Sequence, residues 1–320
     1  MTTINHHNSD IYDIIIIGGG PACLSAAIYA RRFDMKTLVF DPFAGGTVTK
    51  TDTIENYPGF KSITGMDLAE KLKDHAKSYK PEFVEAFVDK IEKEKNIFII
   101  HSDKKTYKAK SIIYCTGTEH RKLGVPGEKE FANKGVHYCA VCDGHFYKDK
   151  IVAVNGSGDS AAKDALVLSR LAKKVYLIAR KAIHPEPIVL DRIKACKNIE
   201  IIENTPIKEI VGDKKIKKII LKKPHQGKKE IELDGLFIGI GHVAITKYAK
   251  ELGVRLNDKG EIIADNLMKT SMKGFFVAGD VTNMPFKQAI IASSQGCIAA
   301  YSAYEYVTKE HITTYDEEGQ

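Results

Sequence analysis

The chain has 320 residues and a mass of 35.5 kDa, which is long for one domain and sufficient for two. Its hydrophobic content of 43% is ordinary for a globular protein, and no apolar run approaches the roughly 20 residues of a membrane span. Residues 1–10 are polar and lack the features of a secretory signal, so we expect a cytoplasmic protein. The net charge of +7 comes mainly from scattered lysines without interleaved aromatics, so no nucleic-acid partner is expected.

The cysteines are scattered, with one exception. They stand at positions 23, 115, 139, 142, 196 and 297. This pattern does not resemble a secreted disulfide scaffold, and a structural zinc site would usually need a second close pair. We therefore expect no metal site, and Cys139 and Cys142 stand out as a candidate redox pair.

The first part of the chain has the pattern of a dinucleotide-binding unit. An apolar run over Ile11–Ile17 predicts a buried strand, and Gly18-Gly19-Gly20-Pro21-Ala22 follows it. A helix is predicted from Leu24 to Arg32, and a second strand, 36–40, ends on Asp41. Such a glycine loop places a pyrophosphate at a helix N-terminus, and an acid about 20 residues later binds a ribose hydroxyl.

The same pattern occurs a second time. A strand is predicted over residues 151–154, followed by the loop G-S-G-D-S-A at 156–161 and a helix through Leu171. Another strand, 175–178, ends near Arg180. One G-x-G-x-x-G loop is weak evidence, whereas two loops, each between a strand and a helix, are a moderately strong indication of two nucleotide-binding units.

The remaining elements complete both halves. Lysine-rich stretches at 82–110 and 207–233 predict a small antiparallel insert after each of the two nucleotide-binding units. A buried strand is then predicted after each insert, at 111–118 and at 236–242. A further strand ends on Asp280, and a helix is predicted over 288–306. The predicted class is α/β, with two Rossmann-like three-layer nucleotide-binding domains, the second inserted into the first, each with a small antiparallel β insert. The outer domain is expected at 1–119 and 246–320 and the inner one at 122–243, with crossings near Pro126-Gly127 and His242.

The redox motif lies between the two glycine loops. In Cys139-Ala-Val-Cys142-Asp143 the two thiols are close enough to close a disulfide, and the carboxylate can supply the proton that a departing thiolate takes up. The candidate catalytic residues are therefore Cys139, Cys142 and Asp143. His145 could shuttle protons there, although contact with a partner is the favoured interpretation.

Five motifs together resemble one family. G-G-G-P-A near the start, E-N-Y-P-G at 55–59, C-x-x-C-D-G at 139–144, V-A-G-D at 277–280 and K-Q-A at 287–289 occur in the order found in low-molecular-weight thioredoxin reductases. These are FAD-dependent pyridine nucleotide-disulfide oxidoreductases. The resemblance implies electron transfer from NAD(P)H to FAD, to the Cys139–Cys142 disulfide and on to a thioredoxin- or glutaredoxin-like protein, with rotation of the inner domain. It also implies a homodimer.

The resemblance assigns roles to individual residues. It makes Cys142 the thiol nearest the flavin, Cys139 the exposed thiol that attacks the partner, and Asp143 the acid and base. For FAD it implies Gly18, Gly20, Pro21, Ala22, Asp41, Gly46, Thr47, Asn56, Val88, Thr116, Gly117, Gly279, Asp280, Lys287, Gln288 and Ala289. For NAD(P)H it implies Gly156, Gly158, Asp159, Ser160, Arg180, Lys181 and Gly241.

Three departures from the family pattern affect these expectations. Cys23 replaces a glycine, and we interpret it as a small buried residue rather than a regulatory thiol. Thr47 replaces a glutamine, which alters one flavin-side contact. At the site expected to bind the 2′-phosphate of NADPH, Arg180 and Lys181 remain but a later arginine of the family pattern is missing. Lys163 could partly replace the lost positive charge.

The third departure leaves the electron donor open. NADPH binding is expected to be weakened, since each charge-assisted hydrogen bond contributes roughly 1.5–3 kcal/mol. NADH, ferredoxin or reduced flavin as donor, or a dithiol oxidase, are alternatives. A non-catalytic nucleotide sensor is a remote alternative, because a sensor has no evident use for a complete thiol pair with its acid.

Overall fold

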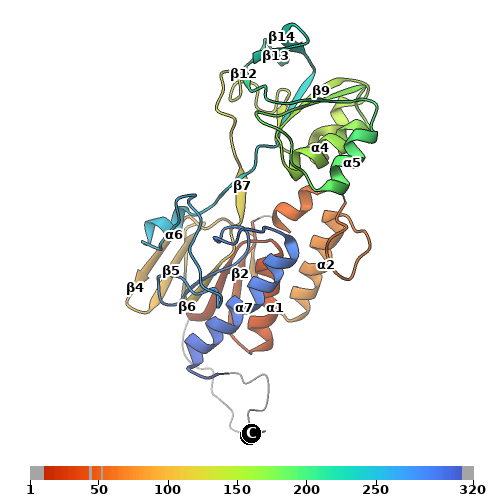
Figure 1. The fold of residues 1–320 in the computed structure, drawn as a ribbon. Coiled ribbons are helices and arrows are strands. Elements are labelled where there is room, and N and C mark those ends of the chain that lie inside the picture. The colour runs from red at the N-terminus through yellow and green to blue at the C-terminus, as the bar shows by residue number, and fades with distance from the viewer. Residues whose placement is uncertain (1–10, 43–44, 52, 312–320) are drawn as a thin grey trace. The chain divides into compact units, whose positions relative to one another are not determined.

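The computed structural model describes residues 11–42, 45–51 and 53–311, which form two compact units (Figure 1). Unit 1 contains the chain up to Thr118 and again from Ala244, and unit 2 is Glu119–Val243. The chain passes between them in two paired strands, β7 (Thr118–His120) and β16 (His242–Ala244). Pro126, expected at a crossing, lies inside unit 2, where its carbonyl accepts a hydrogen bond from the Ile210 N–H at 3.0 Å.

The sheet of unit 1 has the order β3-β2-β1-β6-β5-β4, with β17 also paired to β6. Neighbouring pairs among β3, β2, β1, β6 and β17 are parallel, and β4 and β5 are antiparallel additions. Its strands are β1 (Ile11–Ile17), β2 (Thr37–Phe40), β3 (Glu82–Val84), β4 (Lys90–Glu94), β5 (Ile97–Ser102), β6 (Lys105–Tyr114) and β17 (Phe275–Val277). The sequence suggested an insert that ends at residue 110 and a separate strand at 111–118, but β6 is continuous across this boundary, so the insert extends the main sheet.

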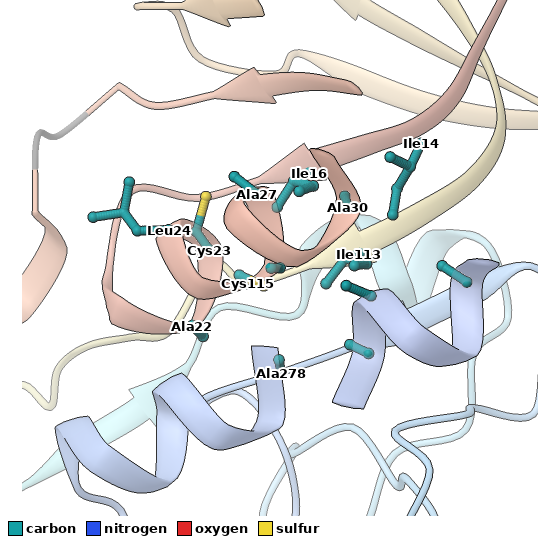
Figure 2. Close-up of a cluster of buried hydrophobic side chains, with 14 of the residues drawn as sticks. Ile14, Ile16, Ala22, Cys23, Leu24, Ala27, Ala30, Ile113, Cys115 and Ala278 are labelled. Atoms are coloured by element: carbon teal, nitrogen blue, oxygen red, sulfur yellow. The ribbon is translucent and has the colours of Figure 1, made fainter. Parts of the chain in front are cut away.

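Both faces of β1 are buried, which explains its uninterrupted run of isoleucines. Ile14 and Ile16 join a cluster with the alanines of helix α1, as Figure 2 shows, while Ile15 and Ile17 join a cluster on the other face. The helices of unit 1 are α1 (Pro21–Arg32), the 3₁₀ turn η1 (Gly46–Lys50), α2 (Gly65–Ser78), α6 (Lys247–Glu251) and α7 (Ala289–Thr308). Helices α1 and α7 pack closely, since a Cβ at Gly296 would lie 2.1 Å from the Ala22 carbonyl oxygen.

Unit 2 repeats the plan with an all-parallel sheet of order β11-β10-β9-β15-β8. Its strands are β8 (Val136–His137), β9 (Ile151–Asn155), β10 (Lys174–Ile178), β11 (Ile199–Ile202) and β15 (Gly235–Ile238). Its helices are α3 (Ala140–Asp143), η2 (Gly144–Tyr147), α4 (Asp159–Ser169) and α5 (Pro187–Ala195). A separate antiparallel sheet contains β12 (Ile207–Gly212), β13 (Ile216–His225) and β14 (Lys228–Glu232). These sheets confirm the predicted α/β class.

Each glycine loop lies at a point where the strand order reverses. The loop after β1 lies beside the end of β6, and the loop after β9 lies beside the end of β15. A Cβ at Gly18 would lie 2.2 Å from the Cys115 carbonyl oxygen, and a Cβ at Gly156 would lie 2.2 Å from the Gly239 carbonyl oxygen. Ligands of parallel α/β sheets bind outside the carboxyl ends of the strands at such points. Each unit therefore has its own candidate nucleotide crevice.

No helix in the described part of the chain combines the length and the apolar character needed to cross a bilayer.

Candidate active site

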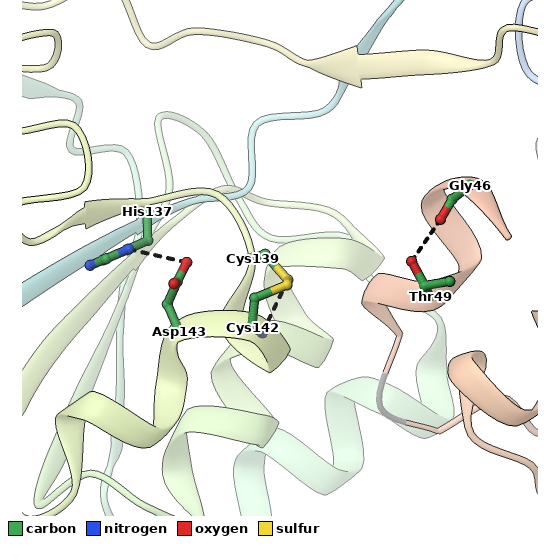
Figure 3. The surroundings of a disulfide bond; sticks show 6 residues. All are labelled: Gly46, Thr49, His137, Cys139, Cys142 and Asp143. Atoms are coloured by element: carbon green, nitrogen blue, oxygen red, sulfur yellow. Dashed lines mark hydrogen bonds and ion pairs between the residues drawn. A yellow bond between two sulfur atoms is a disulfide. The ribbon is translucent and has the colours of Figure 1, made fainter. Parts of the chain in front are cut away.

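The redox loop of unit 2 contains a disulfide between Cys139 and Cys142 (Figure 3). Cys139 is the N-cap of the short helix α3, so one helical turn brings the two Cα atoms to 5.3 Å. The Cys142 N–H donates to the Cys139 Sγ at 3.1 Å. The same N–H can stabilise a thiolate at Cys139 after reduction, because hydrogen bonds from helix N-termini lower thiol pKa values.

The exposure of the two cysteines differs from the expectation. Cys139 was expected to be the exposed thiol, but it is 9% exposed, whereas Cys142 is exposed. The reason is local: Cys139 directly precedes the buried Ala140 as the cap of α3, and Cys142 lies one turn further along the helix.

Asp143 is linked to a buried histidine that the sequence did not indicate. Its Oδ2 lies 3.1 Å from the Nδ1 of His137, and the Nε2 of His137 lies 2.7 Å from the hydroxyl of Tyr147. Figure 3 shows His137 and Asp143 facing each other beside the disulfide. His145, which the sequence singled out, is exposed, and its ring contacts Phe146. His137 escaped notice because it belongs to β8, and no spacing rule pairs it with residues on α3 and η2.

A second carboxyl group lies against the redox helix. Asp164 of α4 accepts a hydrogen bond from the Ala140 backbone N–H, and burial raises its pKa to about 7, an effect that this hydrogen bond partly opposes. The sequence offered no signal for this residue beyond its place in a predicted helix.

Three segments of unit 1 come together at the start of α1. A Cβ at Gly46 would lie 2.9 Å from the Gly20 Cα, and a Cβ at Gly279 would lie 3.1 Å from the Ala22 Cβ. Helix α1 begins at Pro21 and has no side-chain hydrogen bond at its N-cap. Its first free N–H groups are therefore available to an anionic ligand such as a pyrophosphate.

Asp41 directly follows β2, whose last residue, Phe40, accepts a hydrogen bond from the Gly18 N–H of the glycine loop. Its buried Oδ2 lies 2.8 Å from the Nζ of Lys73, while its Oδ1 has no hydrogen-bond partner among the described residues. Burial lowers the pKa of Lys73, but the hydrogen bond and charge of Asp41 outweigh this effect and raise it. An unsatisfied buried carboxylate oxygen fits a ribose hydroxyl as its donor.

Other residues assigned to the flavin occupy defined positions in unit 1. The Nδ2 of Asn56 donates to the Oε1 of Gln288 at 3.1 Å. The hydroxyl of Thr116 donates to the Ile245 carbonyl at 2.8 Å. The others are the exposed Thr47, the buried Val88, Gly117 at a φ of +66°, Asp280 after β17 and Ala289 at the start of α7.

Lys287, another residue assigned to the flavin, has its side chain bound within unit 1. Its ammonium lies 2.9 Å from the Glu261 carboxylate and donates to the carbonyls of Asp280 and Thr282. The charged end of this side chain is therefore held by the protein and braces the loop before α7.

The segment that follows Arg180 is hydrogen-bonded to the glycine loop of unit 2 and to the start of α4. Helix α4 begins at Asp159, with Ser160 in its first turn and Gly158 as an N-cap that has no side-chain hydrogen bond. The His184 N–H donates to the Ser157 carbonyl at 2.7 Å, and the Glu186 N–H donates to the Asp159 carboxylate at 2.6 Å.

The charges expected at the 2′-phosphate site are only partly available. Arg180 and Lys181 are exposed, but the Nζ of Lys163 lies 3.3 Å from the Asp159 carboxylate. Gly241, beyond β15, has a φ of +94°.

Two further cysteines are enclosed in the core of unit 1. The Cys23 thiol donates to the Gly18 carbonyl at 2.8 Å, and burial raises its pKa well above the ordinary value. Burial also raises the pKa of Cys115. Both lie in the cluster of Figure 2. Their position agrees with the interpretation of Cys23 as a packing residue.

Comparison with known proteins agrees with this geometry. The family model for pyridine nucleotide-disulphide oxidoreductases matches residues 12–296. A thioredoxin reductase of Listeria monocytogenes is 40% identical over 301 residues, covering 93% of this chain and 94% of the relative. The crystal structure of Lactococcus lactis thioredoxin reductase aligns with a TM-score of 0.90 at 37% identity, over 93% of this chain and 100% of that one. A ferredoxin-flavin thioredoxin reductase from Clostridium acetobutylicum aligns with a TM-score of 0.52 at 33% identity, over 94% and 99%.

The chain belongs to the pyridine nucleotide-disulphide oxidoreductase family. Within that family it is a member of the thioredoxin reductases. The family implies a flavin and a pyridine nucleotide as cofactors, and the two crevices, one per unit, provide uncapped helix N-termini and glycine loops of the kind that bind their phosphates.

Proposed function

We propose that the protein is a thioredoxin-disulfide reductase, in which electrons pass from NAD(P)H through FAD to the Cys139–Cys142 disulfide and on to a thioredoxin- or glutaredoxin-like protein. The observation that carries this proposal is a disulfide flanked by Asp143 in a chain with two dinucleotide crevices. The thiol pair supplies the acceptor, and the carboxyl supplies the proton that a departing thiolate takes up.

The flavin is proposed to be FAD in unit 1. The uncapped start of α1 and the unsatisfied Oδ1 of Asp41 fit a pyrophosphate and an adenosine ribose, which only the dinucleotide form of flavin contains. Bound FAD would accept two electrons from the nucleotide and transfer them to the disulfide. The segments around Gly46, Thr116 and Asp280 would enclose the rest of the molecule.

Cys139 is proposed as the nucleophile toward the partner disulfide. It is the less exposed cysteine in the disulfide form, but the Cys142 N–H at 3.1 Å favours a thiolate at Cys139 once the bond is reduced. Cys142 would then resolve the mixed disulfide. The nucleotide crevice and the disulfide both belong to unit 2. The bound nicotinamide and the disulfide can therefore reach the one flavin only one after the other. We therefore propose rotation of this unit about the paired strands β7 and β16.

The electron donor is proposed to be a pyridine nucleotide with weak discrimination between NADPH and NADH. Arg180 and Lys181 are exposed and could contact a 2′-phosphate, whereas Lys163 is paired with Asp159. The reduced set of cations also supports a second candidate, in which ferredoxin or reduced flavin supplies the electrons. The likeness to the ferredoxin-flavin thioredoxin reductase supports that candidate. A homodimer and a cytoplasmic location remain predictions.

Anaerobic titration of the purified protein tests these proposals. The flavin absorbance should bleach on addition of micromolar NADPH or NADH and return when an oxidised thioredoxin is added. Bleaching by dithionite or reduced ferredoxin alone would favour the second candidate. A protein that stays colourless after reconstitution with FAD would contradict both.

A further inference from the structure

His137 lies buried between two polar groups of the redox loop. Its side chain is 8% exposed, its Nδ1 lies 3.1 Å from Asp143 Oδ2, and its Nε2 lies 2.7 Å from the Tyr147 hydroxyl. The Nδ1 forms no conventional hydrogen bond within the described residues, so Asp143 is the group it faces. The ring stacks on Phe237 at 5.3 Å between centroids, which fixes its plane.

Other charged and polar groups surround this pair. Asp234 and Asp143 contribute to the pKa of Tyr147, which burial, the larger effect, raises to about 12, so the phenol is neutral at physiological pH. Lys150 lies 5.5 Å from the Tyr147 ring centroid and donates to the Phe146 carbonyl. A cavity of about 460 Å³ opens beside these groups, lined by residues that include His137, Asp143, Tyr147, Lys134, Lys215 and Asp234.

The exchange reaction requires a proton at Asp143. The Cys139 thiolate forms a bond to one partner sulfur, the partner disulfide breaks, and the departing sulfur takes a proton from Asp143. Cys142 then forms a bond to the Cys139 sulfur, and the second partner sulfur leaves with the proton that Cys142 gives up. The enzyme dithiol becomes a disulfide, the partner disulfide becomes two thiols, and Asp143 must be reprotonated before the next cycle.

An isolated carboxyl is poorly suited to this task. Free aspartic acid titrates near 3.9 and imidazole near 6.5, so a carboxyl alone holds a proton in only about one molecule per thousand at neutral pH. A carboxyl and an imidazole in contact titrate as a pair, and their common proton persists to higher pH than that of the carboxyl alone.

We propose, on the basis of the disulfide-reductase function above, that His137 and Asp143 share the proton delivered to the departing thiolate, with His137 as a positioning residue held by Tyr147. When the imidazolium is formed, its Nε2–H donates to the Tyr147 oxygen and its Nδ1–H points at Asp143. The proton crosses to Asp143 and then to the departing sulfur. Water in the adjoining cavity returns one proton to the pair.

A pH profile of the exchange half-reaction tests this assignment. The flavin-loaded protein is reduced with dithiothreitol and desalted, and its reaction with oxidised thioredoxin is followed by stopped flow between pH 5.5 and 9. The variants are His137→Gln, His137→Ala and Tyr147→Phe, the last of which removes one oxygen and preserves ring packing. His225→Gln is the matched control, because His225 forms a similar histidine–carboxylate pair with Glu200 at 2.7 Å on the same unit.

The sign of the change separates delivery of a proton from a merely structural contact. In His137→Gln the pH at which exchange slows should move down by at least one unit. The rate at pH 7 should fall about tenfold, less than the roughly 10²–10⁴-fold of a whole general acid, because Asp143 itself remains. A histidine that only donated a hydrogen bond to the carboxylate would give the opposite shift, because its loss would favour the protonated acid. Added imidazole, which can enter the cavity, should restore the exchange rate of His137→Ala. Tyr147→Phe should lower the pH at which exchange slows, by less than His137→Gln does.

A second readout requires no turnover. The pH dependence of iodoacetamide alkylation of the reduced thiols should change in His137→Gln and stay as in the parent in His225→Gln. Parallel profiles for the parent and His137→Gln, with no imidazole rescue, would overturn the assignment to His137 while leaving the reductase function intact. A parent dithiol that fails to reduce any thioredoxin would instead overturn the function itself.

Discussion

The carboxylate of Asp41 and the ammonium of Lys73 form a buried ion pair at 2.8 Å at the end of β2, with side-chain exposures of 0% and 13%. Lys73 belongs to α2, so this pair ties the helix to the carboxyl edge of the sheet. It also holds the carboxylate in an orientation that leaves Oδ1 unsatisfied among the described residues. The pair thus serves both packing and the proposed ribose contact.

Lys73→Met should destabilise unit 1 markedly. Removal of one member of a buried pair leaves an uncompensated charge, at a cost of about 3–5 kcal/mol. Urea unfolding followed by circular dichroism should show this loss, and Asp41→Asn combined with Lys73→Met should recover most of it. Lys71→Met, on the exposed side of the same helix, is the control. Equal midpoints of urea unfolding for Lys73→Met and Lys71→Met would contradict a stabilising role of the Asp41–Lys73 pair.

Asp41→Asn alone should weaken flavin retention. Loss of a charged hydrogen bond to a ribose hydroxyl corresponds to about 1.5–3 kcal/mol, or roughly tenfold or more in affinity. Fluorescence of released flavin during dialysis measures the effect. Retention equal to that of the parent would remove Asp41 from the proposed FAD site.

Asp164 should make stability depend on pH. Burial raises its pKa from 3.8 to about 7, so the folded state holds the proton more tightly than the unfolded chain. Its stabilising contribution is therefore fully present below about pH 4 and is lost as the pH rises toward 7. Asp164→Asn, whose amide oxygen can still accept from Ala140, should raise the melting temperature at pH 8 and not at pH 4.

The size of this effect follows from the pKa shift. One pKa unit corresponds to about 1.4 kcal/mol, so the gain at pH 8 should be of the order of 2 kcal/mol after allowance for partial exposure. Asp191→Asn on the exposed surface of α5 is the control. A melting difference between Asp164→Asn and the parent that does not change with pH would refute the assignment.

Cys142→Ser should trap a covalent adduct with thioredoxin. If Cys139 is the nucleophile, its bond to the partner cannot be resolved once the Cys142 thiol is removed. Non-reducing electrophoresis and mass spectrometry should detect the adduct with Cys142→Ser and not with Cys139→Ser, and Cys196→Ser should behave like the parent. An adduct formed only by Cys139→Ser would make Cys142 the nucleophile and Cys139 the resolving thiol. Such a result would agree with the exposure of Cys142 in the disulfide form.

Arg180→Ala should lower kcat/KM for NADPH and leave that for NADH nearly unchanged. One lost charge-assisted contact to a 2′-phosphate corresponds to roughly a tenfold decrease or more. Lys194→Ala on α5 is the control. An equal decrease of kcat/KM for both nucleotides would show that Arg180 does not contact the 2′-phosphate.

Periodicity and loop chemistry predicted the elements whose causes are local. The isoleucines of β1 and the two glycine loops were interpreted correctly, because burial of both strand faces and a strand–turn–helix connection leave direct marks in the sequence. The continuity of β6 was not predicted, since it depends on pairing with β5 at one end and β17 at the other. Strand length set by distant partners has no signature within the strand itself.

The site shows the same limit. The Cys139–Cys142 pair could be predicted from spacing alone. His137 could not, because its partners lie on α3 and η2, and only the fold brings them within hydrogen-bonding distance. The ion pair between the Lys287 ammonium and the Glu261 carboxylate is another contact that only the fold brings about.

Electron uptake per chain tests the central claim most directly. In an anaerobic dithionite titration the flavin-loaded parent should take up twice as many electrons as the Cys139→Ser/Cys142→Ser variant, because flavin and disulfide are each two-electron centres. The parent's fully reduced form should then return its flavin to the oxidised state on addition of oxidised thioredoxin, and the variant should not. Equal electron uptake by the two proteins, or equal flavin reoxidation by thioredoxin, would contradict a path through this disulfide.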